Sequence, residues 1–339
     1  MDNETPIEEL SNPGALLDTR TEAEKAKDYK FGEIVSAVEP VVWKEKSPEQ
    51  WRKFPIFNQN GSGSCVAQTL RKLYGVYLWL RTGVWVDISA SHIYQRRVNR
   101  PSAGMGGTDV FTIGQKGTTL NSFAPSDNMS DSQMDAVNVI PFMAKIGETF
   151  KLGNYIVVSP TDIDTVASII QATGKAVMVW FYFRNDEWTD TPTVKYPALD
   201  LYAASTARHS VAAVDFALVN GKKCLIIDDS WGLAYAMQGQ RVITEDFFIK
   251  RNFFAAHFQN FAFEELTTPK PHYLPGNTVS LQECLKHYGT FPTNVASSGV
   301  FGEVTKKAVS QFQVKEGLHA TGTGTVGPLT RARLLELYP

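Results

Sequence analysis

The longest amphipathic pattern in the chain follows a short polar stretch. Residues 58 to 64 are Asn, Gln, Gly and Ser only, a composition that favours a tight turn with exposed backbone amides. From Val66 to Leu80, apolar residues recur at spacings of four, three, four and three, which marks one face of a helix. The pattern predicts a loop that leads into a helix, with Cys65 at the junction.

The middle of the chain predicts a helix, a strand and a loop in that order. Apolar residues at helical spacing between 160 and 173 predict a helix with Thr161 as its N-cap. A continuous apolar run from 176 to 183 then has the character of a central strand buried on both faces. The mostly polar residues from 185 to 197 are predicted to form a surface loop.

A β-hairpin is predicted next. Two apolar runs, 210–218 and 224–227, flank the Asn-Gly pair at 220–221, which is a strong hairpin turn signal. His209 precedes the first run and Asp229 follows the second. Antiparallel pairing would therefore bring both side chains to the same end of the hairpin.

The last part of the chain predicts a boundary and a small second domain. Residues 242–266 are rich in Phe and are predicted to add further strands, which completes a domain over 33–266. The Pro-rich residues 267–276 have no periodicity and are predicted to be a linker. Three short helical patterns follow in 277–339, the first with Ser280 and Glu283 as a capping box.

The N-terminal residues carry no candidate chemistry. The first 30 residues contain eight acidic and four basic side chains and few large apolar ones. We expect residues 1–32 to form a mobile acidic tail or an arm that folds on a partner. The lack of an amphipathic helical pattern argues against a pro-segment that covers an active site.

Composition excludes several classes of protein. The chain has 339 residues, 43% of them hydrophobic, which is enough for two globular domains. A net charge of −2 without a Lys/Arg-rich run argues against a nucleic-acid partner. The three cysteines are too scattered for a disulfide framework or a metal site, so we expect no cofactor.

The sequence predicts neither a membrane span nor a secretory signal. No run of about 18 apolar residues occurs, and the acidic start lacks the apolar core of a signal peptide. We expect a protein made in the cytoplasm that reaches the outside by lysis, in a virion or through a dedicated secretion device.

Cys65 is the candidate nucleophile. The positive end of a helix dipole and its unpaired amides favour a thiolate at this position. Gln59, six residues earlier, could donate to the same oxyanion as the Cys65 backbone amide. On the hairpin, His209 could act as a base oriented by Asp229, with the neighbouring Asp228 as the alternative.

Two segments resemble the papain-like cysteine peptidases, whose patterns are N-Q-G-S-C-G-S-C-W and H-A-V…G…K-N-S-W-G. The matching residues are Asn58, Gln59, Gly63, Ser64, Cys65 and Ala67 in the first pattern, and His209, Ser230, Trp231 and Gly232 in the second. The resemblance covers residues 36–265 approximately. It implies an α+β fold of two subdomains with cysteine peptidase activity.

The resemblance also implies a role for each site residue. Cys65 would attack a peptide carbonyl, Gln59 would help to hold the oxyanion, and His209 would act as base and then as acid. Asp229 would fix the imidazole tautomer, and Trp231 would shield that hydrogen bond. The residues expected to contact substrate are Gly63, Ser64, Gly106, Gly107 and Trp231.

Three residues depart from the family pattern. Ser62 stands where the family has a disulfide-forming cysteine, and Val66 replaces an aromatic residue. Asp229 stands in place of the usual Asn, which argues for an altered pH dependence. Without the disulfide, the loop must hold Gln59 in some other way.

The C-terminal residues resemble the peptidoglycan-binding domain family. The segments that carry the resemblance are LQECLKHYG, SGVFGEVTKKAVSQFQ and TGTVGPLTRARL. Most of these residues are core and turn positions, so they indicate the three-helix fold more directly than ligand contacts. The resemblance implies that residues 277–339 bind peptidoglycan or a similar wall glycan.

The sequence therefore predicts a cysteine endopeptidase with a peptide or protein substrate, directed to the bacterial cell wall. Phage-encoded or virion-associated origin fits the expected absence of a signal peptide. Two alternatives remain: a structural or adhesion protein with a catalytically silent peptidase fold, and a thiol acyltransferase or deamidase with the same side chains.

Overall fold

The computed structural model describes residues 14–26, 40–148, 150–158, 160–183, 188, 193–194, 207–259, 271, 273–292, 295 and 297–339. The chain divides into two compact units, Met1–Phe263 and Glu264–Pro339. Each unit has apolar core residues of its own. Among the described helices, none is long and apolar enough to cross a membrane.

The central helix of the first unit is α3, Cys65–Thr82. This confirms the helix that the apolar spacing predicts. Residues from Cys65 to Val76 are all buried, so the first three turns are enclosed on every side rather than on one face. The helix ends at Gly83, whose left-handed backbone (φ 70°) lets its N–H bond to the Trp79 carbonyl.

A seven-stranded sheet lies beside α3, in the order β1-β7-β2-β4-β5-β6-β3. All neighbouring strands are antiparallel except β3 and β6. The strands are β1 Tyr155–Val158, β2 Val177–Phe183, β3 Thr193–Val194, β4 Ala207–Val219, β5 Lys222–Asp228, β6 Gln240–Thr244 and β7 Asn252–Phe258. The predicted buried strand is β2, which lies inside the sheet.

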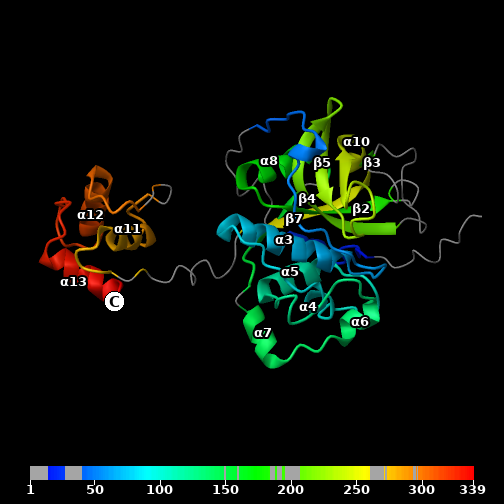
Figure 1. The fold of residues 1–339 in the computed structure, drawn as a ribbon, viewed down its shortest axis with the longest axis horizontal. Helices are drawn as coiled ribbons and strands as arrows, with labels where there is room; N and C mark the ends of the chain where they lie inside the picture. The colour runs from blue at the N-terminus through cyan, green and yellow to red at the C-terminus, as the bar shows by residue number, and fades with distance from the viewer. Residues whose placement is uncertain are drawn as a thin grey trace, which may run out of the picture. The chain divides into compact units, whose positions relative to one another are not determined.

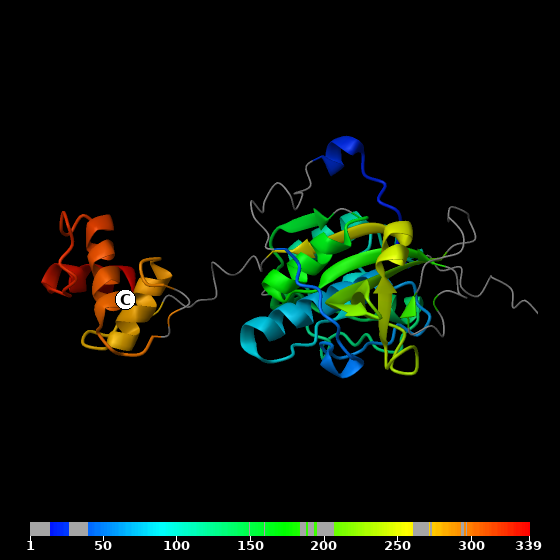
Figure 2. The ribbon, with the colours of Figure 1, turned by 90° about the horizontal axis from the view of Figure 1, so that it is seen from above.

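Each face of this sheet is covered by its own apolar core. One core joins α3 to β2, β4 and β7, and the smaller helices lie on the far side of α3 (Figure 1). The other core places α8 and α10 over the opposite face (Figure 2). The remaining helices of the unit are α1 Glu22–Lys25, η2 Pro48–Gln50, α4 Ala90–Tyr94, α5 Gly107–Lys116, α6 Asp131–Ala136, α7 Pro141–Gly147, α8 Ile163–Thr173 and α10 Glu245–Arg251.

The predicted hairpin is formed by β4 and β5. Asn220 and Gly221 adopt left-handed backbone angles, φ 53° and 73°, as an Asn-Gly hairpin turn requires. The strands pair from Val219 and Lys222 at the turn, with a shift of register between Ala213 and Asp215. This β-bulge decides which acidic residue reaches the candidate site.

Three of the elements predicted between residues 160 and 266 differ from the structure. The cap of α8 is Asp162, not Thr161, because the Asp162 carboxylate accepts the Thr165 N–H. The stretch predicted as strands after 242 contains α10, which Thr244 caps by accepting the Phe247 N–H. Trp188, from the predicted surface loop, is fully buried.

The second unit is a three-helix module. Its helices are α11 Thr278–His287, α12 Glu303–Lys315 and α13 Pro328–Leu337. Apolar side chains from all three, among them Leu285, Phe312 and Leu334, form one core. Asn277 caps α11 by accepting the Ser280 N–H, so the predicted capping box at Ser280 is wrong by three residues.

Candidate active site

His209 and Asp229 form a buried hydrogen-bonded pair. The Nε2 atom of His209 lies 2.7 Å from Asp229 Oδ1, and the Cys65 side chain is near enough to the imidazole to raise its pKa. Burial alone would lower the pKa of His209, but Asp229 and Cys65 outweigh it and raise the pKa to about 9. With Nε2–H directed at the carboxylate, Nδ1 is the nitrogen left for the thiol.

The β-bulge explains why Asp229 takes this position. A regular continuation from the turn would place Asp228 on the face of β4 that carries His209. The shift between Ala213 and Asp215 adds one residue to β4, so that later side chains of β5 change face. Asp229 is thereby brought to the His209 side.

The alternative orienting residue, Asp228, has different partners. Lys72 Nζ lies 2.8 Å from Asp228 Oδ2, and Gln240 Nε2 donates to Oδ1 at 2.8 Å. Both Asp228 and Lys72 are buried. Asp228 thus anchors α3 to the sheet and does not orient His209.

Asp229 receives donors on both carboxylate oxygens. Besides His209, Oδ1 accepts the Ser230 backbone N–H at 2.7 Å. Arg241 Nε and Trp188 Nε1 donate to Oδ2 at 2.7 and 3.0 Å. Burial would raise the pKa of Asp229, but His209 and Arg241 lower it to about 2.

Cys65 is the first residue of α3 and is fully buried. Its carbonyl accepts the Thr69 hydroxyl at 2.9 Å, and Thr69 Oγ1 accepts the Ser210 hydroxyl at 2.9 Å. Ser210 is the neighbour of His209 on β4. These two hydrogen bonds tie the start of the helix to the strand that carries the imidazole.

Gln59 is held by serines rather than by a disulfide. Its Nε2 donates to the Ser62 carbonyl at 2.6 Å, and its Oε1 accepts the Ser230 hydroxyl at 2.6 Å. Ser62 Oγ donates to the Gln59 carbonyl at 2.6 Å and lies 2.7 Å from Ser64 Oγ. An amide NH₂ has two hydrogens, so the second remains to meet a substrate oxygen.

Gly63, in the last part of this loop, is closely packed. Its N–H donates to Asp131 Oδ1 at 2.9 Å, and the Tyr94 hydroxyl donates to the same oxygen at 2.6 Å. A Cβ on Gly63 would lie 2.7 Å from the Gly104 nitrogen, so only glycine fits. The close packing fixes the backbone that leads through Ser64 into α3.

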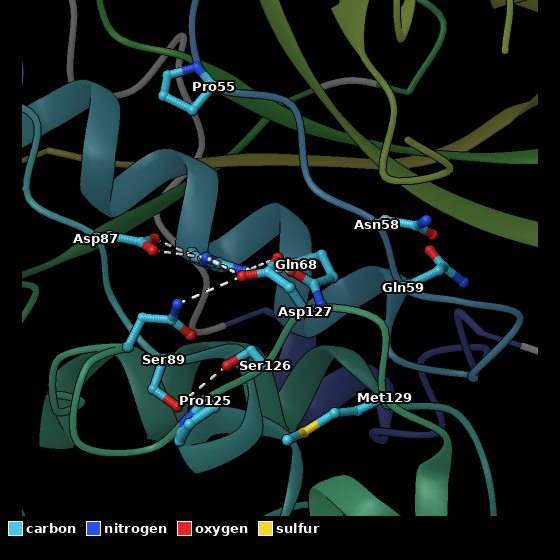
Figure 3. A network of polar contacts seen from close by, with 12 residues as sticks. Pro55, Asn58, Gln59, Gln68, Asp87, Ser89, Pro125, Ser126, Asp127 and Met129 are labelled. Atoms are coloured by element: carbon cyan, nitrogen blue, oxygen red, sulfur yellow. Dashed lines mark hydrogen bonds and ion pairs between the residues drawn. The ribbon is translucent and has the colours of Figure 1, made fainter. Parts of the chain in front are cut away.

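A buried arginine supports the loop from the other side. Arg71 on α3 bonds to Asp87 and Asp127 at 2.7 and 2.9 Å, and these carboxylates converge at the helix (Figure 3). Its guanidinium carbon lies 3.7 Å from the centre of the Phe57 ring. Phe57 precedes the loop directly, so this contact fixes where the segment with Gln59 starts.

Of the other predicted substrate contacts, Trp231 lies beside His209, whereas Gly106 and Gly107 lie at the start of α5. The half-buried Trp231 ring lies 5.6 Å from the His209 ring, and Trp231 forms a bridge with Asn58. Gly106 caps α5, and Gly107 is its first residue. Space is open around the Cα of Gly106.

The N-terminal segment covers Cys65. Leu16 N–H donates to the Met105 carbonyl at 2.8 Å, and Met105 N–H donates to the Gly14 carbonyl at 3.0 Å. A Cβ on Gly14 would collide with the Cys65 sulfur. The expectation that this tail leaves the site uncovered is therefore wrong for this stretch, because a short extended strand suffices without an amphipathic helix.

Sequence reasoning missed several residues of this centre. Arg241 lies in a short strand of mixed polarity, and Trp188 in a polar stretch, so neither has a local pattern that points to Asp229. An arginine directly before apolar strand residues does imply a buried acidic partner, which is the signal that could have been followed. Gly14 has no such signal.

The fold of the first unit is that of the papain-like cysteine peptidases, an α+β class, and a peptidoglycan-binding type of helical module follows it. Xylellain, a cysteine protease from Xylella fastidiosa, aligns with a TM-score of 0.57 and 16% identity, over 74% of this chain and 96% of that one. The digestive procathepsin L2 of Tenebrio molitor aligns with a TM-score of 0.56 and 18% identity, over 76% and 81%.

A procathepsin B from Trypanosoma congolense aligns with a TM-score of 0.54 and 14% identity, over 76% of this chain and 88% of that one. Residues 276–334 match the family described as "Putative peptidoglycan binding domain". A search of curated protein sequences found no match. At these identities, the structural matches establish the fold of the first unit.

Proposed function

We propose that this protein is a cysteine endopeptidase in which Cys65, His209 and Asp229 act together. The observation that carries the proposal is a buried imidazole that is hydrogen-bonded to the Asp229 carboxylate and near enough to Cys65 for that side chain to raise its pKa. Asp229 fixes the tautomer and stabilises the imidazolium, so that a thiolate–imidazolium pair is favoured in the buried site.

In the proposed reaction, the Cys65 sulfur attacks a peptide carbonyl while His209 Nδ1 holds the proton taken from the thiol. The oxyanion receives N–H groups from the Gln59 side chain and the Cys65 backbone. The C–N bond breaks as His209 gives its proton to the leaving amine. Water, deprotonated by His209, then releases the acyl group and restores the thiol.

We propose further that the C-terminal module binds peptidoglycan and so raises the concentration of the peptidase at the bacterial wall. The family match over residues 276–334 supports this. The substrate would then be a wall peptide or a wall-associated protein. Association with a bacteriophage particle stays a prediction from the sequence.

Peptide hydrolysis by the purified chain tests the peptidase. Cys65→Ala and His209→Ala should each lower the rate of hydrolysis at least about a hundredfold, because the first removes the nucleophile and the second removes the base. Cys224→Ala is the matched control, since Cys224 is buried in the sheet away from His209. Gly14→Val is tested in the same series, because a side chain at Gly14 would collide with the Cys65 sulfur that this residue covers.

Product analysis separates the alternatives. Denatured protein and purified sacculi are offered as substrates, and products are identified by mass spectrometry. Transfer of the acyl group to an amine would assign an acyltransferase, and release of ammonia from a side-chain amide would assign a deamidase. The Gly14→Val variant is compared with the Gly14→Val/Cys65→Ala double variant. Equal product yields from these two proteins would leave only a structural role.

A further inference from the structure

A buried arginine lies behind the acidic member of the site. Arg241 is fully buried on β6 and donates from Nε to Asp229 Oδ2 at 2.7 Å. Its register partner on β5 is Ile227, so the arginine side chain lies on the same face of the sheet as Asp229. Nη1 also donates to the Trp188 carbonyl, which leaves the guanidinium little freedom to turn away.

The Asp229 carboxylate is saturated by this arrangement. His209 and the Ser230 N–H share one oxygen, while Arg241 and Trp188 share the other. Each oxygen has two lone-pair sites, so four donors fill them. The carboxylate therefore cannot rotate toward Cys65 without breaking a bond to a fixed donor.

From Cys65 to Arg241, negative and positive groups follow one another in turn. A Cys65 thiolate, the His209 imidazolium, the Asp229 carboxylate and the Arg241 guanidinium would together carry no net charge. The other nearby acid, Asp228, is already paired with Lys72. Without Arg241, two anions would face the imidazolium in a buried site where charges interact strongly.

We propose that Arg241 is a positioning residue that neutralises Asp229 and thereby limits how tightly His209 holds its proton. This inference rests on the proposed function, since the benefit is a His209 that can both keep a proton beside the thiolate and pass it to a leaving amine. The role of Arg241 also explains why the site can carry a carboxylate at position 229. The Asp229–Arg241 pair takes the place of the neutral Asn of the papain-like pattern.

The test follows the proton on His209 directly in the full chain. Histidine labelled with ¹³C at Cε1 is titrated by NMR, and the His209 signal is assigned by its loss in His209→Gln. Arg241→Gln removes the charge but keeps a donor, and Arg241→Lys keeps the charge. We expect the His209 midpoint to rise by about one pH unit or more in Arg241→Gln, and to stay near the native value in Arg241→Lys.

Asp229→Asn, alone and combined with Arg241→Gln, completes the set. Asp229→Asn leaves a buried guanidinium without its counter-charge, so the His209 midpoint should be the lowest of all the variants. In the double variant the midpoint should recover part of the way toward the native value, because both charges are gone. This order distinguishes an electrostatic role from support of the strand alone.

A midpoint in Arg241→Gln that is unchanged or lower would overturn the proposal. If Arg241→Gln does not fold, a folded double variant would support it, since the unpaired Asp229 charge is then the cause. A double variant that also fails to fold would overturn it, because Arg241 would then be needed for β6 itself. None of these readings requires a substrate, so failure of the peptidase assay is a separate result.

Discussion

At the scale of single residues, the site depends on buried charges that satisfy one another. His209, Asp229 and Arg241 are all buried, and each has a partner within 2.7 Å. Such groups are costly to bury singly and tolerable as a connected set. Removing one member therefore affects stability as well as chemistry, and the pH dependence of stability reports on the set.

The pH dependence follows from the pKa of His209, which is raised in the folded protein to about 9. A raised pKa stabilises the fold fully below the unfolded value of about 6.5, and this contribution is lost as the pH rises to about 9. We expect the free energy of unfolding of the native chain to fall across this window, by at most about 1.4 kcal/mol per pH unit.

Urea unfolding followed by tryptophan fluorescence measures this fall, because all seven tryptophans lie at or before Trp231 and so report on the first unit. His209→Gln should remove the fall. His92→Gln should keep it, because burial lowers the pKa of His92 to about 4 and it stays neutral in this window. A slope that persists in His209→Gln would contradict the assignment.

At the scale of elements, two short segments shape the site through hydrogen bonds: one covers Cys65 and the other holds Gln59. The extended segment from Gly14 to Leu16 covers Cys65 and pairs with Met105. The turn that carries Gln59 is closed by two side-chain hydrogen bonds between Gln59 and Ser62, where the related family pattern has a disulfide. Each of these two arrangements depends on only a few hydrogen bonds, so single substitutions can disturb it.

The Gly14 contact predicts a gain in reactivity on substitution. Gly14→Val introduces a side chain that collides with the Cys65 sulfur, and overpacking of this kind costs about 1–3 kcal/mol. The uncovered state should gain population, and alkylation of Cys65 by iodoacetamide at neutral pH should be about tenfold faster. Leu17→Val is the control, because Leu17 is 48% exposed.

Mass spectrometry assigns the alkylated site. Cys224 and Cys284 should react slowly in every variant, since burial raises the pKa of each thiol to about 11. An unchanged Cys65 rate in Gly14→Val would mean that the segment does not restrict access. A rate no greater than those of Cys224 and Cys284 would count against a reactive cysteine altogether.

At the scale of the whole molecule, the proposed chemistry and the proposed wall binding belong to separate units. The site residues all lie in Met1–Phe263, and the match to a peptidoglycan-binding family lies in Glu264–Pro339. The second unit has its own apolar core. Loss of one unit should therefore remove one function and leave the other.

Retention on purified sacculi tests this division. The full chain should sediment with sacculi, whereas residues 1–263 should stay in solution and keep the catalytic activity of the first unit. Equal retention of both proteins would remove the wall-binding role from the C-terminal module. A Cys65→Ala full chain should be retained as well as the native chain, which controls for binding through the cleft.

The sequence by itself determined the elements whose signals are local. Helical spacing placed α3 and put Cys65 at its start, and the Asn-Gly pair placed the β4–β5 turn. Motif spacing pointed to Gln59 and His209, and the C-terminal pattern identified the module. The predictions of α3 and of the β4–β5 turn are confirmed, because side-chain periodicity and turn conformations depend on residues a few positions apart.

Only the tertiary structure decided the rest. A bulge of one residue assigned Asp229 rather than Asp228 to His209, and the packing of β6 brought Arg241 to that carboxylate. The pairing of Gly14 with Met105 covered the sulfur. The physical reason is common to all three: each contact depends on how distant segments pack, and no local pattern encodes a register that the packing sets.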